Sequence, residues 1–145
     1  MDKYPLQQIP TLHKFGDDDH LLFAQVLNNE QVMANVTGSA ISEDDIQDAW
    51  NNRVRIINRQ CELFGYYKIM VDAHYAGYVK IIPNDDIFTK PCIEIGYFLL
   101  PEFWGKGIGF MVGRQLVKLA KSQNLPIIAT VNRKKYDIQK AINQA

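Results

Sequence analysis

A glycine-punctuated loop, Trp104-Gly105-Lys106-Gly107-Ile108-Gly109, has the composition of an anion-binding turn. It follows an apolar run and leads directly into a segment with helical periodicity. Amides in the first turn of a helix have no partner inside the helix, and the helix dipole adds partial positive charge there. Glycines remove the Cβ atoms that would hold a phosphate away from those amides, and Lys106 adds a cation. The loop therefore predicts phosphate binding.

The spacing of the glycines excludes two common phosphate-binding motifs. A Walker A loop needs four residues between its first glycine and a Gly-Lys-Ser/Thr, whereas Lys106 lies between glycines. The Rossmann fingerprint needs a third glycine where Phe110 stands, and an acidic residue about 20 positions later, where residues 128–131 include no acidic residue. Either the loop belongs to a different kind of phosphate-binding motif, or its glycines serve only to allow close packing.

The segments around the loop must hold it in place. Residues 93–100 read as an apolar strand, followed by a turn at Pro101-Glu102-Phe103. Residues 127–131 predict a further buried strand. Between the loop and that strand, apolar residues recur at the spacing that keeps one helical face on a core: Ile108, Val112, Leu116 and Leu119.

Two helical patterns precede this region. One follows a first strand over residues 8–15 and has an apolar face at Leu22, Phe23, Val26 and Leu27. Residues 30–35 predict a short helix. The second pattern opens at Ser42, a favoured N-cap residue, and carries an apolar stripe at Ile46, Trp50, Val54 and Ile57.

Aromatic and β-branched residues predict a hairpin, with strands over residues 63–71 and 76–82 and a turn at 72–75. Residues 133–144 predict a last, modest helix. This order of elements favours an α+β fold, in which a mixed, mostly antiparallel sheet is covered by helices on both faces. The length of 145 residues suits a single domain over residues 1–145.

Composition limits the partners. The 16 basic and 16 acidic residues balance, which argues against broad binding to nucleic acid or to an anionic membrane. Cys61 and Cys92 make neither a disulfide framework nor a metal site, and the three histidines are scattered. No window approaches about 18 apolar residues, and the N-terminus lacks a signal-peptide pattern. We therefore expect a cytoplasmic protein that uses no metal.

The run from Glu94 to Gly109, E-I-G-Y-F-L-L-P-E-F-W-G-K-G-I-G, resembles the GNAT superfamily of N-acetyltransferases. A strand, a proline and a G-x-G-x-G loop before a helix stand in the order of that family's pyrophosphate loop. Leu99-Leu100-Pro101 matches its Val-x-Pro lead-in. Tryptophan at position 104 is common in the Rim-type branch, which comprises the ribosomal-protein N-acetyltransferases and their relatives. The resemblance is strongest over residues 69–131.

The resemblance implies an enzyme that moves an acetyl group from acetyl-CoA to a primary amine, on a protein N-terminus or a small molecule, by direct attack. In the family the central strand carries a bulge and splays from the next strand, which here is residues 127–131, to admit the pantetheine arm. The main chain of the central strand then holds the thioester, while the glycine-rich loop holds the pyrophosphate. The residues implied at the cofactor are Phe98, Leu99, Leu100, Trp104, Gly105, Lys106, Gly107, Ile108, Gly109 and Asn132.

Two residues are candidates for proton transfer. Glu94 lies within the central strand and is the candidate base, with a structural hydrogen-bonding role as the alternative. Family members often place this glutamate one residue earlier, where Ile93 stands, and such a shift turns the side chain to the other face. Tyr136 is the candidate acid for the leaving thiolate, although the family's tyrosine position holds Gln139 here. The alternative is a surface or packing tyrosine.

The chain stops at Ala145, where the family continues with at least one more strand. This favours a truncated copy, or a homodimer in which a partner chain completes the sheet, because an open sheet edge tends to pair. Two other functions stay open. One is a catalytically silent acyl-CoA-binding module, and the other is a dimerisation domain whose loop binds nothing.

Overall fold

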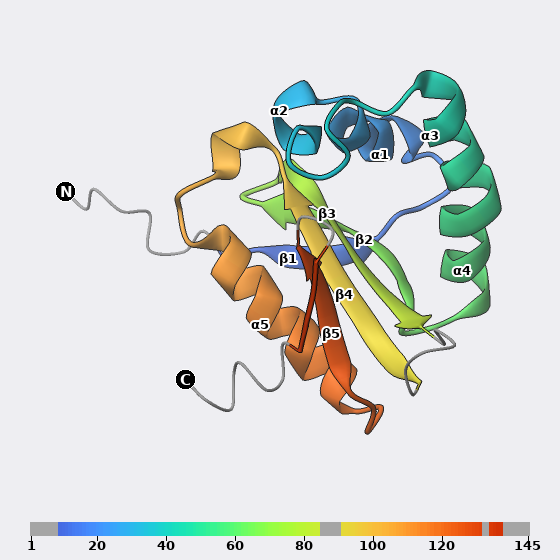
Figure 1. Ribbon diagram of the computed structural model, residues 1–145, viewed down its shortest axis with the longest axis vertical. Helices are drawn as coiled ribbons and strands as arrows, with labels where there is room; N and C mark the ends of the chain where they lie inside the picture. Colours follow the sequence, from blue (N-terminus) through green and yellow to red (C-terminus); the bar gives the residue numbers. More distant parts are fainter. Residues whose placement is uncertain (1–8, 85–90, 132–133, 138–145) are drawn as a thin grey trace.

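A computed structural model of the protein describes residues 9–84, 91–131 and 134–137 (Figure 1). A six-stranded sheet runs in the order β1-β2-β3-β4-β5-β6. In chain order the elements are β1 (Thr11–Lys14), α1 (His20–Leu27), α2 (Glu30–Met33), α3 (Glu43–Ala49), a π-helical turn (Trp50–Val54), α4 (Arg55–Gln60), β2 (Gly65–Val71), β3 (His74–Asn84), β4 (Cys92–Leu99), a 3-10 turn (Pro101–Phe103), α5 (Ile108–Lys121), β5 (Ile127–Val131) and β6 (Lys134–Asp137).

Neighbouring strands are antiparallel except for β4 and β5, which are parallel. The β2–β3 hairpin closes through Asp72 and Ala73, whose φ angles of 49° and 66° are those of a two-residue turn that matches the twist of the strands. Val71 and His74 pair on either side of it. The predicted hairpin and the mixed, mostly antiparallel sheet are therefore confirmed.

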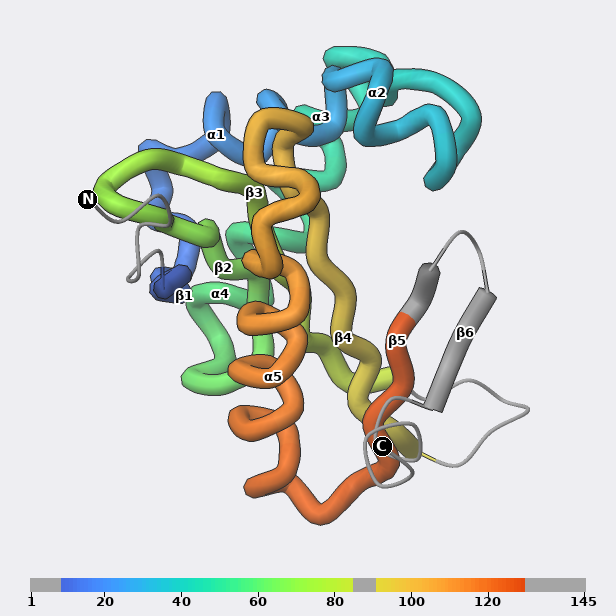
Figure 2. Tube along the Cα trace, turned by 90° about the vertical axis from the view of Figure 1, so that its left-hand side faces the viewer, coloured from blue at the N-terminus to red at the C-terminus, as the bar shows by residue number. Residues whose placement is uncertain are grey.

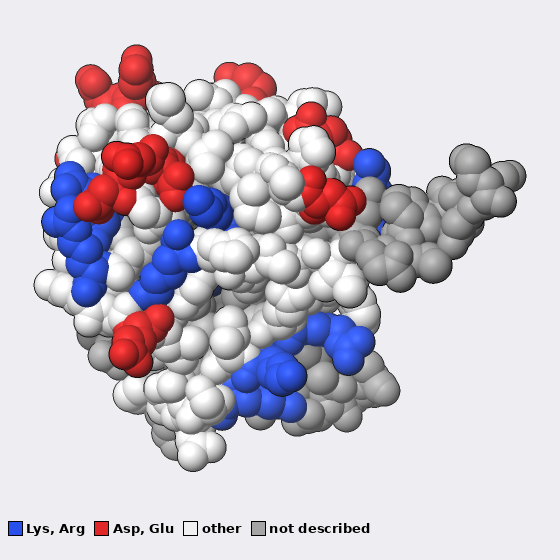
Figure 3. Space-filling model, turned by 180° about the vertical axis from the view of Figure 1, so that it is seen from behind, with Lys and Arg blue, Asp and Glu red and all other residues white. Residues whose placement is uncertain are grey.

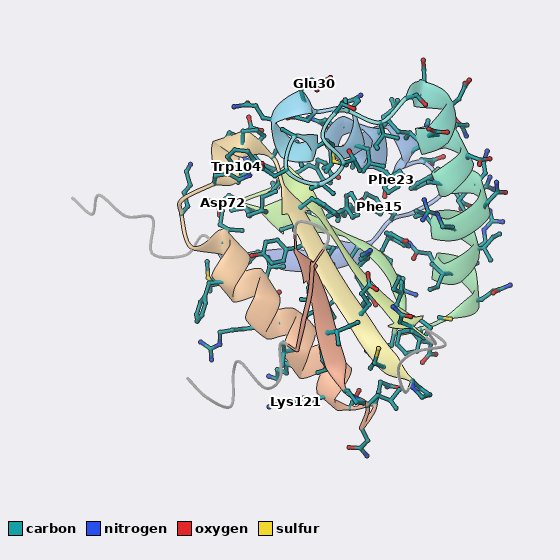
Figure 4. The ribbon with its side chains drawn as sticks, viewed as in Figure 1. Phe15, Phe23, Glu30, Asp72, Trp104 and Lys121 are labelled. Atoms are coloured by element: carbon teal, nitrogen blue, oxygen red, sulfur yellow. The ribbon has the colours of Figure 1, made fainter. Side chains whose placement is uncertain are left out.

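The helices bury apolar residues on both faces of the sheet, as the sequence predicts (Figures 1 and 2). On one face, α5 contributes Ile108, Val112 and Leu116 to a core with β-strand residues. On the other face, α1 to α4 cover an aromatic cluster that includes Phe15 and Phe23, both labelled in Figure 4. The ring of Phe15 lies edge-on to Trp50, with 5.7 Å between their centroids. Helices on both faces therefore pack against β4, which lies inside the sheet with a strand on either side.

Two local predictions are wrong. The helix expected over residues 133–144 is replaced at its start by β6, which pairs antiparallel with β5; residues 138–145 lie outside the described ranges. Pairing in this way satisfies backbone groups along the outer edge of β5, which a helix would leave open. In α5, Leu119 is exposed and Ala120 is buried instead, because the buried stripe continues in steps of four from Leu116.

Candidate active site

β4 and β5 pair only at their first residues and then separate. Their register runs from Ile93–Ile127 to Ile95–Ala129 and ends there. On its other edge, β5 pairs with β6 over residues 128–131. Beyond Ile95, β4 therefore keeps β3 on one edge and has no paired strand on its other edge within the described residues. The splay that the sequence predicts between these two strands is confirmed.

The direction of the β4 amides decides which of them face this gap. The amide of Leu100 donates to the carbonyl of Ala76 on the β3 side, whereas that of Ile93 donates to Pro126 on the β5 side, both at 2.8 Å. Amides alternate in direction along an antiparallel pair. The amides of Tyr97 and Leu99 consequently point into the gap.

This alternation corrects the expected main-chain contacts. The amide of Leu99 faces the gap, as predicted. The amide of Leu100 instead donates to β3, and the amide of Phe98 points toward β3 as well. Tyr97 is a site residue that the sequence analysis missed, although the two-residue period from Leu99 would have found it. The expected bulge is also wrong for this pair of strands, since the β3–β4 register runs without a shift from Leu99 to Cys92.

A cavity of about 430 Å³ lies beside the gap, between β4, the start of α5 and α2. Its wall includes most of the predicted cofactor residues: Phe98, Leu99, Trp104, Gly105, Gly107, Ile108 and Gly109. Val32, Tyr97, Phe103 and Phe110 complete it. Lys106 and Leu100 are not part of the wall, and Asn132 lies outside the described residues. The loop, the strand and the helix that the sequence singled out thus meet at one hollow.

The loop exposes backbone amides at the mouth of this cavity. Gly105 and Gly107 have φ angles of 72° and 79°, and a Cβ on either would point into open space. Positive φ on both sides of Lys106 turns successive N–H groups into an anion-binding concavity. The first helical bond of α5 runs from Met111 to the carbonyl of Gly107, so the amides of residues 108–110 have no partner within the helix.

Trp104 joins the loop to the end of β4. Its indole Nε1 donates to the carbonyl of Leu99 at 2.7 Å, while the ring, labelled in Figure 4, lines the cavity. The hydrogen bond occupies the Leu99 carbonyl and leaves the Leu99 amide directed at the gap. A tryptophan at position 104 therefore fixes the distance between the loop amides and the strand amides.

Glu94 is held in an ion pair on the sheet face covered by α1 to α4. It is 7% exposed, its Oε2 lies 3.0 Å from Lys80 Nζ, and its Oε1 accepts from Asn84 Nδ2 at 2.8 Å. Its charge also raises the pKa of Tyr66, although burial of that phenol is the larger cause. Three residues along a strand separate Glu94 from Tyr97, which is about 10 Å. These contacts match the structural hydrogen-bonding role left open for Glu94.

Tyr136 lies in β6, where its backbone pairs with Ala129. The structure places it on a strand and not on the expected helix, and its side chain is outside what is described. Within the described ranges, no group of three or more His, Cys, Asp or Glu side chains is arranged to hold a metal ion. No helix in those ranges is long and apolar enough to cross a membrane.

Comparison with known proteins identifies a matching family and solved structures with a similar fold. The sequence model of the acetyltransferase (GNAT) domain matches residues 11–142. No curated protein matches the sequence. Among solved structures, the spermidine N-acetyltransferase from Vibrio cholerae, in complex with CoA and spermine, has a TM-score of 0.61 at 20% identity. The similarity covers 85% of this chain and 71% of that one.

Two further solved structures have the same fold. The PaiA N-acetyltransferase from Thermoplasma acidophilum, in complex with coenzyme A, has a TM-score of 0.59 at 14% identity, over 93% of this chain and 86% of that one. The ribosomal-protein-alanine N-acetyltransferase from Brucella melitensis has a TM-score of 0.59 at 16% identity, over 83% of this chain and 74% of that one. At these identities the likeness concerns the fold.

Proposed function

Because this chain belongs to the GNAT acetyltransferase family, we propose that it moves an acetyl group from acetyl-CoA to a primary amine. The acceptor is an amine on a protein N-terminus or a small molecule, and it attacks the thioester directly. One observation carries the proposal: the gap-facing amides of Tyr97 and Leu99 lie along the same cavity as the open amides at the start of α5.

The loop supplies the groups that a diphosphate needs. The amides of residues 108–110 and the concavity around Lys106 offer N–H donors to an anion, and the N-terminal end of α5 adds partial positive charge. Lys106 is exposed and free to bring its ammonium to a phosphate oxygen. The pyrophosphate of acetyl-CoA would therefore bind at the loop, which leaves the pantetheine arm to enter between β4 and β5.

The strand supplies the groups that the thioester needs. As the amine attacks, negative charge grows on the carbonyl oxygen, and a fixed amide donor stabilises that charge; one such donor is worth about 10²–10³ in kcat. The amides of Tyr97 and Leu99 point into the gap and are held in place by β3 and Trp104. Most of the remaining rate gain would come from holding amine and thioester together.

Proton transfer completes the reaction. An amine with a pKa of about 10.4 is neutral in only about one molecule in 10³ at pH 7, so a base lowers the barrier, whereas an α-amino group of pKa about 8 needs less help. Glu94 as the base and Tyr136 as the acid stay predictions. Glu94 lies about 10 Å along β4 from Tyr97, so any base role requires the carboxylate to act through water.

The proposal also covers the domain organisation, the cellular compartment, the use of metal and the oligomeric state. We assign the chain to a single acyl-CoA N-acyltransferase-like domain that works in the cytoplasm without a metal. A homodimer remains an alternative to a monomer.

Release of CoA thiol from acetyl-CoA, followed over a panel of amines, tests this function. Thiol release that depends on one class of amine is the expected result. Calorimetric binding of CoA without thiol release for any amine would leave a binding module and contradict the enzyme. Absence of both binding and turnover would contradict the site itself.

A further inference from the structure

A second cavity, of about 240 Å³, lies between α4 and the segment that joins β1 to α1. Among the described residues it shares none with the cavity beside β4, and α4 and α5 lie on opposite sides of the molecule (Figure 1). Three buried apolar side chains form its floor: Phe15, Trp50 and Val54. An apolar cavity of about 150 Å³ holds benzene, so this one has room for a single aromatic ring.

The helix beside the second cavity changes its geometry at this point. Residues 43–60 form one continuous helical stretch, in which a π-helical turn at Trp50–Val54 separates α3 from α4. Such turns are rare, and those found inside α-helices occur frequently at functional sites. Both end residues of the turn lie in the floor of the cavity, and Arg55, the next residue, also lines it. The irregular turn therefore belongs to this cavity.

Charged side chains form the rim of the cavity: Asp17, Arg55 and Arg59. Arg59 is engaged with Asp17, since 2.9 Å separates its Nη2 from Oδ2. Arg55 interacts more weakly, because its Nε lies 3.9 Å from Oδ1 of Asp17, which is beyond hydrogen-bond distance. That nitrogen has no hydrogen-bond partner among the described residues, and Nη1 makes a long hydrogen bond of 3.4 Å to Asn51. The guanidinium of Arg55 therefore has donors to offer to a ligand.

The rim carries a net positive charge, because two guanidinium groups face one carboxylate. Gly16 also lines the cavity and donates its amide to Asp19, but the Asp19 carboxylate is paired with Lys68 at 3.0 Å. Asp18 is exposed and is not part of the wall. Figure 3 shows basic side chains next to acidic ones on the side of the molecule where α4 lies. An anion with an apolar body therefore suits the rim and the floor together.

We propose that this cavity is a binding site for a small aromatic carboxylate. The ring of the ligand packs on Phe15 and Trp50. Its carboxylate accepts hydrogen bonds from the guanidinium of Arg55, a group that pairs with carboxylates through two parallel N–H donors. Asp17, which lies beside the same guanidinium, competes with the ligand for it. The site is separate from the glycine-rich loop, so it does not depend on the proposed acetyl transfer.

Benzoate is the probe, because it combines one aromatic ring with one carboxylate. Its binding can be followed by NMR through the indole N–H signals of the two tryptophans, Trp50 in this cavity and Trp104 in the cavity beside β4. Trp104→Phe identifies the Trp50 signal. Benzoate should shift that signal saturably and leave the Trp104 signal unchanged. Benzamide, which lacks the charge, and acetate, which lacks the ring, should bind at least about tenfold more weakly.

Variants of the rim test the carboxylate contact. Arg55→Gln should lower the affinity for benzoate about tenfold, the loss expected for one charge-assisted pair, and leave the affinity for benzamide unchanged. Asp17→Asn removes the competing carboxylate and should raise the affinity for benzoate about threefold. Lys118→Gln, which removes one positive charge from α5, is the matched control and should change neither affinity. These side chains are at least partly exposed, so circular dichroism should show an unchanged fold for each variant.

Several results would overturn the site. Equal affinity for benzoate and benzamide removes the carboxylate contact, and equal affinity for benzoate and acetate removes the ring contact. An Arg55→Gln variant with wild-type affinity for benzoate removes the guanidinium, and a shift confined to Trp104 places benzoate in the other cavity. A chain that binds benzoate at Trp50 but releases no thiol from acetyl-CoA would keep this site and contradict the proposed function alone.

Discussion

The phenol oxygen of Tyr97 lies 2.7 Å from the point where a Cβ on Gly109 would stand. This contact joins β4 to the first turn of α5, which form two sides of the cavity. Gly109 has no positive φ, unlike Gly105 and Gly107. A side chain at position 109 would therefore meet the Tyr97 ring, whereas at positions 105 and 107 the positive φ of the loop favours glycine.

Gly109→Ala should separate stability from binding. Alanine is favoured over glycine inside a helix by about 1 kcal/mol, but its Cβ would push the Tyr97 ring aside. That ring is 43% exposed and has room to move, so we expect the free energy of unfolding to change by less than about 1 kcal/mol. The displaced ring should lower CoA affinity about tenfold, a loss of about 1.4 kcal/mol. Thermal unfolding and calorimetry measure the two effects.

Gly113→Ala is the control for that variant, because it lies in the same helix and no atom approaches its Cβ position within 4 Å. It should be stabilised by about 1 kcal/mol with wild-type CoA affinity. The double variant with Tyr97→Phe should recover part of the affinity lost in Gly109→Ala. Wild-type affinity in Gly109→Ala itself would show that Tyr97 does not shape the cofactor site.

Gly107→Ala tests the loop. Its φ of 79° is disfavoured for a residue with a Cβ, at a cost of about 1–2 kcal/mol in unfolding free energy. The Cβ would project into the open space beside the amides, where the pyrophosphate is proposed to bind. We expect CoA affinity to fall more than about tenfold, beyond what the loss of stability explains.

Gly38→Ala provides the comparison, since Gly38 has a φ of 93° and equally open surroundings in the loop after α2. It should lose similar stability and keep wild-type CoA affinity. If the two variants weaken CoA equally, the effect of Gly107→Ala is general strain and the loop assignment is wrong.

Glu94→Gln tests the ion pair with Lys80. Removing the carboxylate charge leaves a part-buried ammonium without its partner, and we expect the free energy of unfolding to fall by about 3 kcal/mol. Replacing both residues, in Lys80→Met/Glu94→Leu, should recover most of that loss, because no unpaired charge remains. Urea denaturation of the wild type and of both variants measures this. A Glu94→Gln variant as stable as the wild type would contradict the account of the pair.

The same variant separates the two roles of Glu94 through the pH dependence of kcat. A base predicts a fall in kcat of about 10² or more and loss of the acid limb of the profile, in the single and the double variant alike. A structural residue predicts an unchanged limb. The ion pair with Lys80 and the hydrogen bond from Asn84 favour the second result.

Buried tyrosines should make the fold sensitive to alkali. Burial raises the pKa of Tyr78 and of Tyr75 far above the usual value. A raised pKa means that the folded chain retains its proton where the unfolded chain loses it, so stability is complete below about pH 10 and falls as the pH rises further. Urea denaturation at about pH 8 and about pH 11 should show this fall, and Tyr78→Phe should reduce it. An equal fall in Tyr78→Phe would assign it to other groups.

Local patterns explain how much of the fold was predictable. The hairpin, the helix after the loop and the strand at residues 127–131 follow from periodicity and turn residues, which are properties of short segments. The loop was predictable because its glycines and the helix start are contiguous. The final helix was mispredicted because the open edge of β5 takes up residues 134–137, and such pairing is a tertiary effect.

The details of the site depend on contacts between distant segments. Whether Leu99 or Leu100 faces the gap depends on which carbonyls β3 presents, and the sequence does not determine that register. The partner of Glu94 is Lys80, on the neighbouring strand and 14 positions earlier (94 − 80). The role of Gly109 likewise depends on a tyrosine twelve positions before it (109 − 97).

Amide hydrogen exchange of individual β4 residues, followed by NMR with and without acetyl-CoA, tests the central claim most directly. The account predicts that the amides of Tyr97 and Leu99, together with those of residues 108–110, shift saturably and become protected when acetyl-CoA is added. The amides of Phe98 and Leu100, which face β3, should keep their exchange rates. Saturable binding that leaves Tyr97 and Leu99 unprotected would contradict the placement of the thioester along β4.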